Sequence, residues 1–424
     1  MQFWKGTAET TEPADLEARN LERLRAHMDR IQAHSGFYRQ RWQQANVDPA
    51  AITSLQALRS VPTVSKQDLI EDQHQNPPFG DLIAADPEDL VRLYVSPGPQ
   101  ATYFTRADLD VTASNAAWVF WCNGFRPADV VDVTINYHWV IAGTIMDDGF
   151  RTIGCTTIPG GLGKAQMHLE NLRWSKATGL FAFPTFLEEL AKTAEELGMN
   201  PATELSLRRC TIAGEMHSAG HRAKMEEFWG GMTVREMYGG AEVPFSAAEC
   251  EMGNGMHLNP DFLIELLHPE TREPVDVGEP GVVVVSETER QAYPMVRYWT
   301  GDLSEGLNTD PCDCGRTTPR LGRIMGRVGD IPRVKGLFVV PKEVAGALAD
   351  FDGLGDFQLV IDRPGTRDEL TVRIEHDGPA DHRADLEPRV VSALKAAIQL
   401  TAEVRFEDPG TLEGEATVVD NRDL

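Results

Sequence analysis

Apolar and polar positions alternate along the first 245 residues in a way that predicts helices and strands in turn. Leu21, Leu24 and Met28 recur at helical spacing with arginine and glutamate between them, which predicts helix over 14–46, with a second helical piece around Trp42. Beyond this region, apolar runs bounded by turn residues predict strands, and amphipathic stretches predict the helices that follow them. The predicted strands are 91–96, 130–136, 155–161, 179–184, 207–215 and 234–240, and the predicted helices are 106–124, 185–197 and 218–229.

The pattern changes after about residue 245, where helical periodicity disappears and strands separated by turn residues follow. A Gly- and Pro-rich stretch then precedes a tail that alternates between strands and helices again. The sequence therefore predicts an α/β fold with a large N-terminal domain of parallel and mixed sheets flanked by helices, plus a small sheet subdomain and a small α+β C-terminal domain. The predicted bounds are 1–326 for the large domain, 327–332 for a hinge linker and 333–424 for a mobile C-terminal domain.

The charge of the chain excludes some classes of partner. Its 424 residues include 65 acidic and 40 basic side chains, a formal charge of −25. A surface of this sign is repelled by phosphates, so neither nucleic acid nor an anionic membrane is an expected partner. Six cysteines are too sparse for a disulfide scaffold, and no secretory signal or apolar run of about 20 residues is evident. We therefore expect a cytoplasmic protein with reduced thiols.

Four soft ligands form the first candidate site. Cys250 and His257 lie in a turn-like stretch, and Cys312 and Cys314 share the loop "PCDCG". Three sulfurs and one imidazole match a closed, structural zinc site, although Cys-x-Cys is tighter than the usual zinc knuckle. Unpaired thiols in a reducing cell are the alternative interpretation.

Two strand ends carry further candidate residues. In "MYGGAE", Tyr238 could stack on a flat ring and Glu242 could hold Mg²⁺ at the carboxyl edge of a sheet, where α/β proteins bind ligands. In "RYWTGDL", Asp302 can accept two hydrogen bonds from a ribose diol. A turn with a core tyrosine and a surface turn are the respective alternatives. The segment 94–105 is a poor candidate for a phosphate-binding loop, because two prolines remove backbone donors, only one glycine is present and no lysine or arginine follows until Arg106.

Read in order, the chain resembles the phenylacetate–CoA ligase branch of the adenylate-forming superfamily. The resemblance extends over nearly the whole length and rests on an ordered set of segments. These are "SGFYRQRW", "SLQALRSVPTVSKQDL", "FAFPTFLEELA", "AGEMHSAGHR", "YGGAEVPFSAAEC", "LLHPETREPVDVGEPG", "YPMVRYWTGDL", "CDCGRTTPRLGRIMGR", "KGLFVVPKEV" and "PGTLEGEATVVDNR".

The resemblance implies a two-step reaction. A carboxylate attacks the α-phosphate of ATP to give an acyl-adenylate and pyrophosphate, and a thiol, usually that of coenzyme A, then displaces AMP. By the same resemblance, Tyr238 would stack on the adenine with Gly239 as a further nucleotide-binding residue, Asp302 would grip the ribose, and Glu242 would bind Mg²⁺. Further assignments that the resemblance implies are Arg327 on the ribose, Gly214 and Glu215 beside the adenine, an acyl pocket near Tyr137, His138, Trp139, Pro184 and Phe186, and zinc on Cys250, His257, Cys312 and Cys314.

The chain departs from the family pattern at the positions whose side chains and backbone would bind the phosphates of ATP. The family's phosphate loop is replaced by Val95–Thr102, which has lost most hydroxyls, one glycine and the lysine. Ala241 replaces a threonine, Gly329 and Asp330 replace the usual hinge acids, and Glu415 stands where a lysine bridges the carboxylate and the α-phosphate. Losing a cation on developing phosphate charge commonly costs about 10²- to 10³-fold in rate. A positive pocket would depend on groups such as Arg297, Arg327 and Lys335.

Three functions follow from these observations. The first is an AMP-forming ligase that joins an aryl or other small organic acid to CoA or to another thiol or amine, with ATP and Mg²⁺. The second is an ATP-independent acyltransferase that takes the acyl group from acyl-CoA and passes it to a carrier protein or amine. The third is a non-catalytic ligand-binding relative. The resemblance also allows a homodimer.

Overall fold

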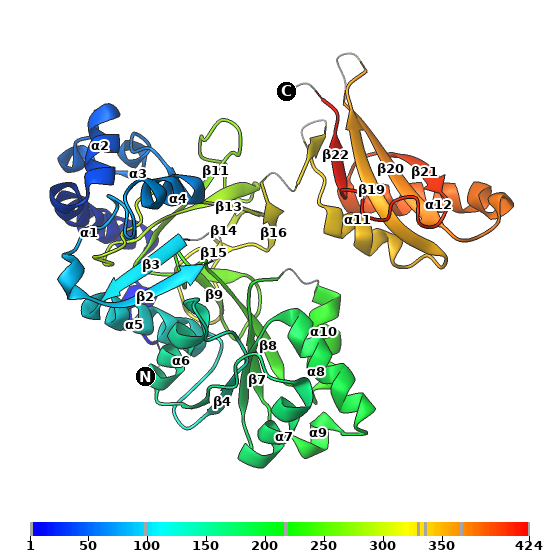
Figure 1. Ribbon diagram of the computed structural model, residues 1–424, viewed down its shortest axis with the longest axis horizontal. Coiled ribbons are helices and arrows are strands. Elements are labelled where there is room, and N and C mark those ends of the chain that lie inside the picture. The colour runs from blue at the N-terminus through cyan, green and yellow to red at the C-terminus, as the bar shows by residue number, and fades with distance from the viewer. Residues whose placement is uncertain are drawn as a thin grey trace. The chain divides into compact units, whose positions relative to one another are not determined.

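The chain divides into two compact units, Met1–Ile324 and Met325–Leu424. The computed structural model, drawn in Figure 1, describes residues 3–96, 100–215, 219–328, 331–334, 337–364 and 368–422. The predicted linker at 327–332 lies just after this division, and its Gly329 and Asp330 fall outside the described residues. Its role as a hinge stays a prediction.

A mixed sheet forms the centre of the N-terminal unit. Its strands are β4 (Val130–Val133), β5 (Thr156–Ile158), β6 (Gly179–Ala182), β7 (Arg209–Ile212), β8 (Thr233–Tyr238), β9 (Ala247–Glu249), β10 (Met256–Leu258), β14 (Leu307–Asn308) and β15 (Arg320–Leu321). Their order is β14-β15-β10-β9-β8-β7-β6-β4-β5. The strands from β5 to β8 pair in parallel, whereas β8 to β14 pair antiparallel. The predicted combination of parallel and mixed sheets is confirmed.

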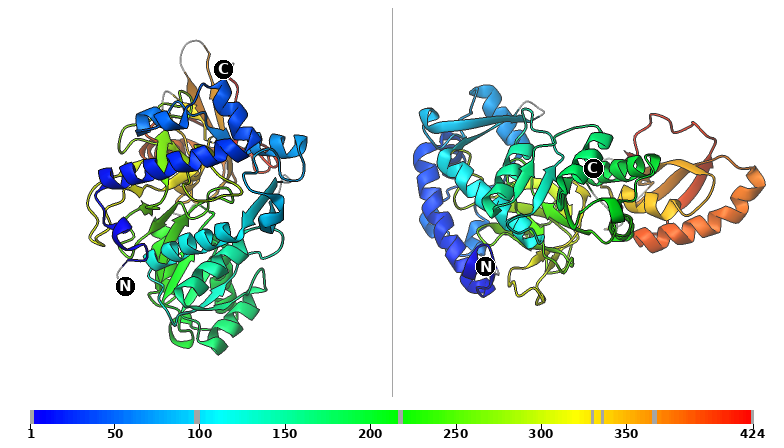
Figure 2. Two further views of the ribbon diagram at one scale, coloured as in Figure 1. Left: turned by 90° about the vertical axis from the view of Figure 1, so that its left-hand side faces the viewer. Right: turned by 90° about the horizontal axis from the view of Figure 1, so that it is seen from below.

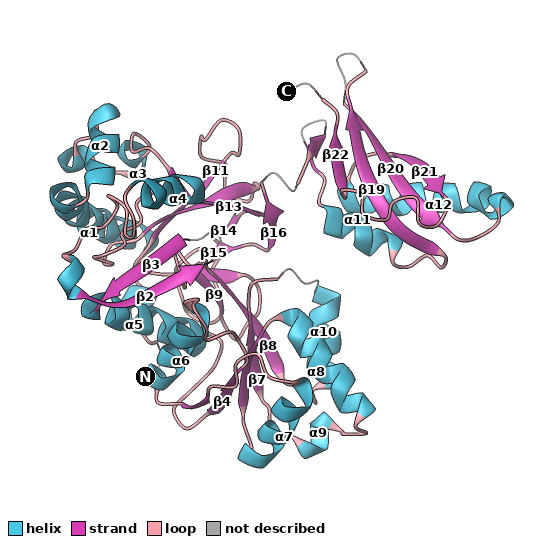
Figure 3. Ribbon diagram, in the orientation of Figure 1, coloured by secondary structure: helices cyan, strands magenta, loops and turns pink. Residues whose placement is uncertain are grey.

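Helices cover both faces of the parallel half (Figure 3). They are α5 (Arg106–Cys122) and α6 (Ala142–Ile153) on one face, and α7 (Ala165–Ser175), α8 (Pro184–Glu196), α9 (Pro201–Glu204) and α10 (Ala219–Phe228) toward the other. Successive side chains of β6 point to opposite faces of the sheet, which explains why both faces are covered by helices. Phe181 packs with α5 and α6, while Leu180 and Ala182 pack with α7 and α8. The carboxyl ends of these strands are therefore left open at one edge of the sheet.

A second sheet packs against the N-terminal helices. The elements are α1 (Pro13–His34), α2 (Gly36–Gln44), α3 (Leu55–Leu58), β1 (Val64–Ser65), α4 (Lys66–Gln75), β11 (Leu263–Leu267), β12 (Gly281–Ser286) and β13 (Tyr298–Ser304). Strand order runs β1-β13-β12-β11. Figure 2 shows α1 lying across this sheet, where its Leu24 and Met28 share a core with Val283 and Val285. The predicted break within 14–46 falls at Ser35, whose side chain caps α2.

The segment after residue 90 differs from its prediction. It forms an antiparallel hairpin of β2 (Leu90–Ser96) and β3 (Gln100–Thr105), rather than a strand of the parallel sheet followed by a loop. Gln73 on α4 holds β3 in place by exchanging two hydrogen bonds with the backbone of Ala101, at 2.7 and 2.8 Å. This contact comes from a distant segment, so local sequence could not indicate it. The hairpin tip at 97–99 lies outside the described residues.

The C-terminal unit is an α+β structure with its own core. Its elements, together with the strand that spans the division, are β16 (Ile324–Arg327), β17 (Arg333–Val334), β18 (Leu337–Phe338), α11 (Pro341–Leu348), β19 (Leu354–Asp362), β20 (Glu369–His376), α12 (Ala380–Ile398), β21 (Glu403–Glu407) and β22 (Val418–Asp420). Strand β22, which the sequence did not predict, pairs in parallel with β19. In the part of the chain that the structure describes, no helix is both long and apolar enough to cross a bilayer.

The packing of α5 on α6 depends on Gly149. A Cβ atom there would collide with the Cβ of Ala116 and approach the Phe120 ring to 2.9 Å. Gly149→Ala should lower the free energy of unfolding of the N-terminal unit by about 1–2 kcal/mol, because overpacking outweighs the gain in helix propensity. Urea unfolding followed by tryptophan fluorescence measures this, since all eight tryptophans precede residue 300.

Gly346 provides the matched control. It also lies within a helix, α11, but a Cβ there would meet no atom within 4 Å. Gly346→Ala should therefore raise the stability of its unit by about 0.5–1 kcal/mol in urea unfolding followed by circular dichroism. Stabilisation by both substitutions would contradict the proposed close packing of α5 and α6.

Candidate functional site

A hydrogen bond joins the two sheets of the N-terminal unit at the end of β8. Tyr238 is the last residue of β8, and its hydroxyl donates to Asp302 Oδ2 on β13 at 2.9 Å. The tyrosine is 8% exposed, and its ring shares the core between the sheets. Both residues were predicted from separate strand ends, and the structure brings them together.

Glu242 lies four residues beyond the end of β8 and is buried. Its Oε1 accepts no hydrogen bond from the described residues, and the Nζ atom of Lys66 lies 3.8 Å away. Burial, with the adjacent Glu242 carboxylate, raises the pKa of Tyr298 above its usual value. The Arg290 guanidinium donates to the main-chain carbonyl of Glu242 and not to its carboxylate. A buried acceptor oxygen at this edge of the sheet is suited to a cation.

The backbone around the end of β8 makes close contacts. Gly214 has a φ of +79°, and a Cβ there would come within 2.7 Å of the Phe183 ring. A Cβ on Gly239 would come within 2.6 Å of the amide nitrogen of Phe245. Glu215 has a local partner, since its carboxylate accepts from the amide of Thr185 at 2.9 Å and from its hydroxyl at 2.8 Å, at the first turn of α8.

An apolar cavity of about 250 Å³ opens beside these glycines. Its walls come from the β2–β3 hairpin, α6 and the ends of β6, β7 and β8. The lining residues are Tyr94, Ser96, Thr102, Ile135, Val140, Ile141, Ala142, Ile145, Met146, Phe181, Phe183, Ala213, Gly214, Met237, Gly239, Gly240, Ala241 and Pro244. The Tyr94 hydroxyl shares a 2.5 Å hydrogen bond with Thr144 Oγ1 and ties the hairpin to α6. A small, largely apolar group suits such a cavity.

The five residues predicted for an acyl pocket are neighbours of this cavity and do not line it. Trp139 is 81% exposed with a φ of +64°, and His138 is also exposed. Tyr137 is partly buried, and burial raises its pKa. Pro184 is buried as the first residue of α8, with Phe186 partly buried behind it. The turn at Trp139 directs the aromatic residues away and leaves Ile135, Val140 and Ile141 at the cavity.

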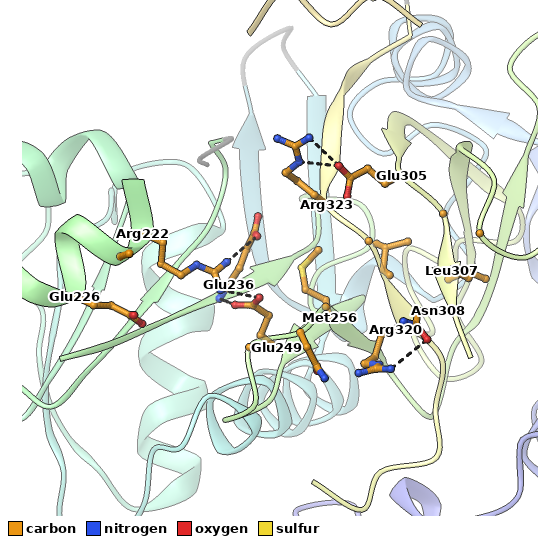
Figure 4. Close-up of a pocket in the computed structure, with 18 residues that line it drawn as sticks. Arg222, Glu226, Glu236, Glu249, Met256, Glu305, Leu307, Asn308, Arg320 and Arg323 are labelled. Carbon is orange, nitrogen blue, oxygen red and sulfur yellow. Dashed lines mark hydrogen bonds and ion pairs between the residues drawn. The ribbon is translucent and has the colours of Figure 1, made fainter. Parts of the chain in front are cut away.

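A second cavity, of about 580 Å³, is lined by charged residues from the antiparallel half of the sheet and from α10 (Figure 4). Arg222 on α10 bonds Glu249 at 2.9 Å and lies 3.8 Å from Glu236. Across the cavity, Arg323 pairs with Glu305 at 2.7 Å. Burial, with the nearby Glu249 carboxylate, raises the pKa of Glu236 to about 8, so its carboxyl group is mostly neutral at pH 7.

The predicted cysteine–histidine set converges on one point. The ligand atoms of Cys250, His257, Cys312 and Cys314 all lie within 4.8 Å of one another. Cys250 Sγ and Cys312 Sγ are 3.7 Å apart, and Cys314 Sγ is 3.4 Å from His257 Nε2. Tetrahedral zinc with Zn–S bonds of about 2.3 Å would separate two sulfurs by about 3.8 Å. The set therefore fits a zinc ion.

The imidazole of His257 is oriented by a backbone carbonyl on the side of the ring opposite the thiols. His257 Nδ1 lies 3.0 Å from the carbonyl oxygen of Thr318, an acceptor that requires the proton on Nδ1. The Nε2 lone pair is then directed at the thiols. A backbone carbonyl that fixes the tautomer in this way is a common second partner of metal-binding histidines.

The other predicted positions bond elsewhere in the fold, belong to the C-terminal unit or fall outside the described residues. Arg297 is buried, with its guanidinium bonded to Glu265 at 2.9 and 3.1 Å. Arg327 ends β16 and is exposed, in the C-terminal unit. Glu415 is exposed in a turn of that unit, where its amide donates to the carbonyl of Leu412. Lys335 and the hairpin tip lie outside the described residues.

The sequence did not indicate Lys66 or the aliphatic lining of the smaller cavity. Helix α4 begins at Lys66 and is capped by Ser65, but nothing local marks the lysine as part of a site. Val140 and Ile141 follow the aromatic residues directly, and apolar alternation through "NYHWVIAG" would have been the only available signal.

Comparisons with known proteins place these features in context. Residues 336–422 match the family model of the AMP-binding enzyme C-terminal domain. Phenylacetate–coenzyme A ligase of Thermus thermophilus is 30% identical over 95% of this chain and 94% of its own length. The ligase of the same name from Pseudomonas putida is 28% identical over 98% and 96%, respectively. An open crystal structure of 2-hydroxyisobutyryl-CoA ligase, in complex with 2-HIB-AMP and CoA, aligns with a TM-score of 0.88 at 27% identity, covering 99% of this chain and 95% of that one.

The protonated carboxyl of Glu236 predicts a pH dependence of stability. Its pKa of about 8 in the folded chain exceeds the ordinary value of 4.5, so the folded state binds the additional proton between these limits. The free energy of unfolding should therefore fall as pH rises from about 5 to 8, by up to about 1.4 kcal/mol per pH unit from this group. Glu236→Gln removes the titration, and urea unfolding at several pH values should give a shallower decline.

Glu227 supplies a control on the same side of the molecule. It is exposed on α10, and Glu227→Gln should leave the pH slope of the wild type unchanged. Equal slopes in the wild type and in the Glu236 variant would contradict a carboxyl group that is kept protonated by burial.

Proposed function

The chain belongs to the phenylacetate–CoA ligase family of adenylate-forming enzymes, and from this premise we propose that it activates a small organic acid with ATP and transfers the acyl group to coenzyme A. The observation that carries the proposal is the position of the apolar cavity. It opens against Gly214 and Gly239, beside the Tyr238–Asp302 hydrogen bond and close in sequence to Glu242. An apolar acyl group and a polar nucleotide can thus be held side by side at one sheet edge.

Family membership supports the assignment of the nucleotide residues. Tyr238 presents an aromatic ring for the adenine, while Asp302 can accept from the ribose hydroxyls beside it. Gly214 and Gly239 allow the backbone to approach the base closely. Glu242 would hold Mg²⁺, which favours one or two carboxylates together with substrate phosphates. Arg327 stays a candidate for the ribose from the family pattern alone.

The lining of the cavity supports a class of acid. Its side chains are mainly aliphatic and aromatic, with Ser96 and Thr102 on the hairpin as polar exceptions. A volume of about 250 Å³ admits an aryl or short branched acyl group and excludes a long fatty chain. The relative of known structure carries a short hydroxy-acyl adenylate, as its name states.

Pyrophosphate release with a panel of acids tests the proposal. Aryl and short branched acids should release pyrophosphate from ATP and Mg²⁺, and long-chain acids should not, because they exceed the cavity. Asp302→Ala should lower the rate by about 10- to 100-fold through the lost hydrogen bonds to substrate. A well-folded wild type that releases no pyrophosphate with any acid contradicts the proposal.

Acyl transfer without ATP is the second candidate function. It is favoured by Glu415, an exposed carboxylate where the family pattern has a lysine, because this residue would repel phosphate. Acyl-CoA would then donate its acyl group to a carrier protein or an amine, with free CoA as the leaving thiol. Transfer from acyl-CoA to such acceptors in the absence of ATP would favour this function over the ligase reaction.

We further propose that Cys250, His257, Cys312 and Cys314 bind one structural zinc ion. Four protein ligands leave no position for substrate, so the ion would stabilise the fold and take no part in the chemistry. The ion would join the loop after β9 to the loop before β15, which are distant in sequence.

Metal analysis of the purified chain tests the zinc site. We expect about one zinc ion per chain, and its loss in Cys312→Ser together with a lower melting temperature. Cys210→Ser is the control, because this buried thiol on β7 lies outside the cluster and its loss should leave the zinc content unchanged. A wild type without bound metal after purification in zinc-supplemented medium would refute the assignment.

A further inference from the structure

Lys66 is positioned by two precise local structures. Strand β1 pairs in parallel with β13, with Val64 opposite Tyr298 and Ser65 opposite Trp299. Helix α4 then begins at Lys66 itself. A capping box fixes this first turn, because the Ser65 hydroxyl accepts from the Asp68 amide and the Asp68 carboxylate accepts from the Ser65 amide at 2.7 Å. The lysine is thereby held beside the strand that carries Asp302.

A lysine at this position is electrostatically unfavourable for the helix. The first turn of an α-helix carries a partial positive charge and favours acidic side chains. Lys66 is the first helical residue, so its positive charge opposes the helix dipole. A lysine retained at a position where it destabilises its own helix suggests a role in a binding or catalytic site.

Lys66 faces a buried carboxylate that its charge only partly satisfies. Its Nζ lies 3.8 Å from Glu242 Oε1, an ion-pair distance that is too long for a hydrogen bond. The Glu242 side chain is 7% exposed, whereas that of Lys66 is 41% exposed. The ammonium can thus move on its flexible stem toward a ligand that enters from solvent.

The arginine beside Glu242 is buried and contacts the main chain of that residue. Arg290 is 3% exposed, forms an ion pair with the Glu287 carboxylate at 2.8 Å and donates to the Glu242 carbonyl. The phenols of Tyr293 and Tyr298 also lie near the Glu242 carboxylate, and both are uncharged because burial raises their pKa values. Lys66 is therefore the mobile cation among the described residues in contact with this carboxylate.

We propose that Lys66 binds the phosphates of ATP and stabilises the adenylation step. This inference rests on the proposed function. In the free protein the ammonium neutralises Glu242, and when the magnesium nucleotide arrives it shifts to a phosphate oxygen. In the adenylation step, a carboxylate oxygen of the acid forms a bond to the α-phosphorus. The bond between the α-phosphorus and the oxygen that bridges it to the β-phosphate breaks. Pyrophosphate leaves with that electron pair, and Lys66 offsets the negative charge that develops.

Calorimetric titration with ATP and with adenosine tests the inference. Lys66→Met should weaken ATP binding by about 10- to 100-fold, the value of a hydrogen bond to a charged group. Binding of adenosine, which has no phosphate, should change by less than about threefold. Lys66→Arg should restore most of the ATP affinity, since it keeps the charge. Lys192→Met is the matched control, an exposed helical lysine on α8 that should behave as the wild type.

The two half-reactions give a second readout. Lys66→Met should slow pyrophosphate formation by about 10- to 100-fold and leave thioester formation from a supplied acyl-adenylate within about threefold of the wild type. Equal loss in both half-reactions, or equal loss of ATP and adenosine binding, would assign Lys66 a structural role and overturn the inference. Wild-type ATP affinity and rate in Lys66→Met would overturn it as well.

These outcomes are separable from those of the proposed function. If the wild type binds ATP but activates no acid, and Lys66→Met loses ATP binding, phosphate binding by Lys66 stands, whereas the ligase function and the role of Lys66 in adenylation fail. If the wild type releases pyrophosphate and Lys66→Met does so at the same rate, the inference alone fails. A wild type that does not bind ATP overturns both.

Discussion

The hydrogen bond from Tyr238 to Asp302 is the contact on which the candidate site depends. It joins the end of β8 in the nine-stranded sheet to β13 in the second sheet, at 2.9 Å. Both residues lie where the two sheets share a core, close to the glycines that line the apolar cavity and to Glu242 in the sequence. The site is thus a product of how two sheets pack, and each sheet alone would carry only half of it.

Charge is the second constraint on this site. The chain has a formal charge of −25, and Glu242 and Asp302 add acidic groups where a nucleotide would bind. A polyanion can enter only if local cations and a metal ion oppose this field. Lys66 meets the buried carboxylate, while Arg297 is engaged by Glu265 and serves the fold. Few cationic groups are therefore available to contact the phosphates. The loss of one such group should have a measurable effect on ATP binding.

Much of this arrangement could be predicted from the sequence, and the exceptions share a physical cause. The parallel strands up to β8 were indicated by their apolar runs, and the ligand set around His257 by residue type. Strand β3 was missed because Gln73, on another element, holds it, and the aliphatic cavity was missed because the turn at Trp139 has a positive φ. Lys66 enters the site through the pairing of β1 with β13, which no local pattern reveals.

Formation of an acyl-adenylate is the step that defines the proposed reaction. Transfer of an oxygen isotope from the acid to AMP measures this step directly. An acid that the enzyme accepts is labelled with ¹⁸O in its carboxylate and incubated with ATP, Mg²⁺ and CoA, and the AMP product is analysed by mass spectrometry. Attack of the carboxylate on the α-phosphorus leaves one of its oxygens on the phosphate when the thiol displaces AMP. The AMP should carry one ¹⁸O atom for each thioester formed. Thioester formation with unlabelled AMP, or with no AMP at all, would contradict the formation of an acyl-adenylate.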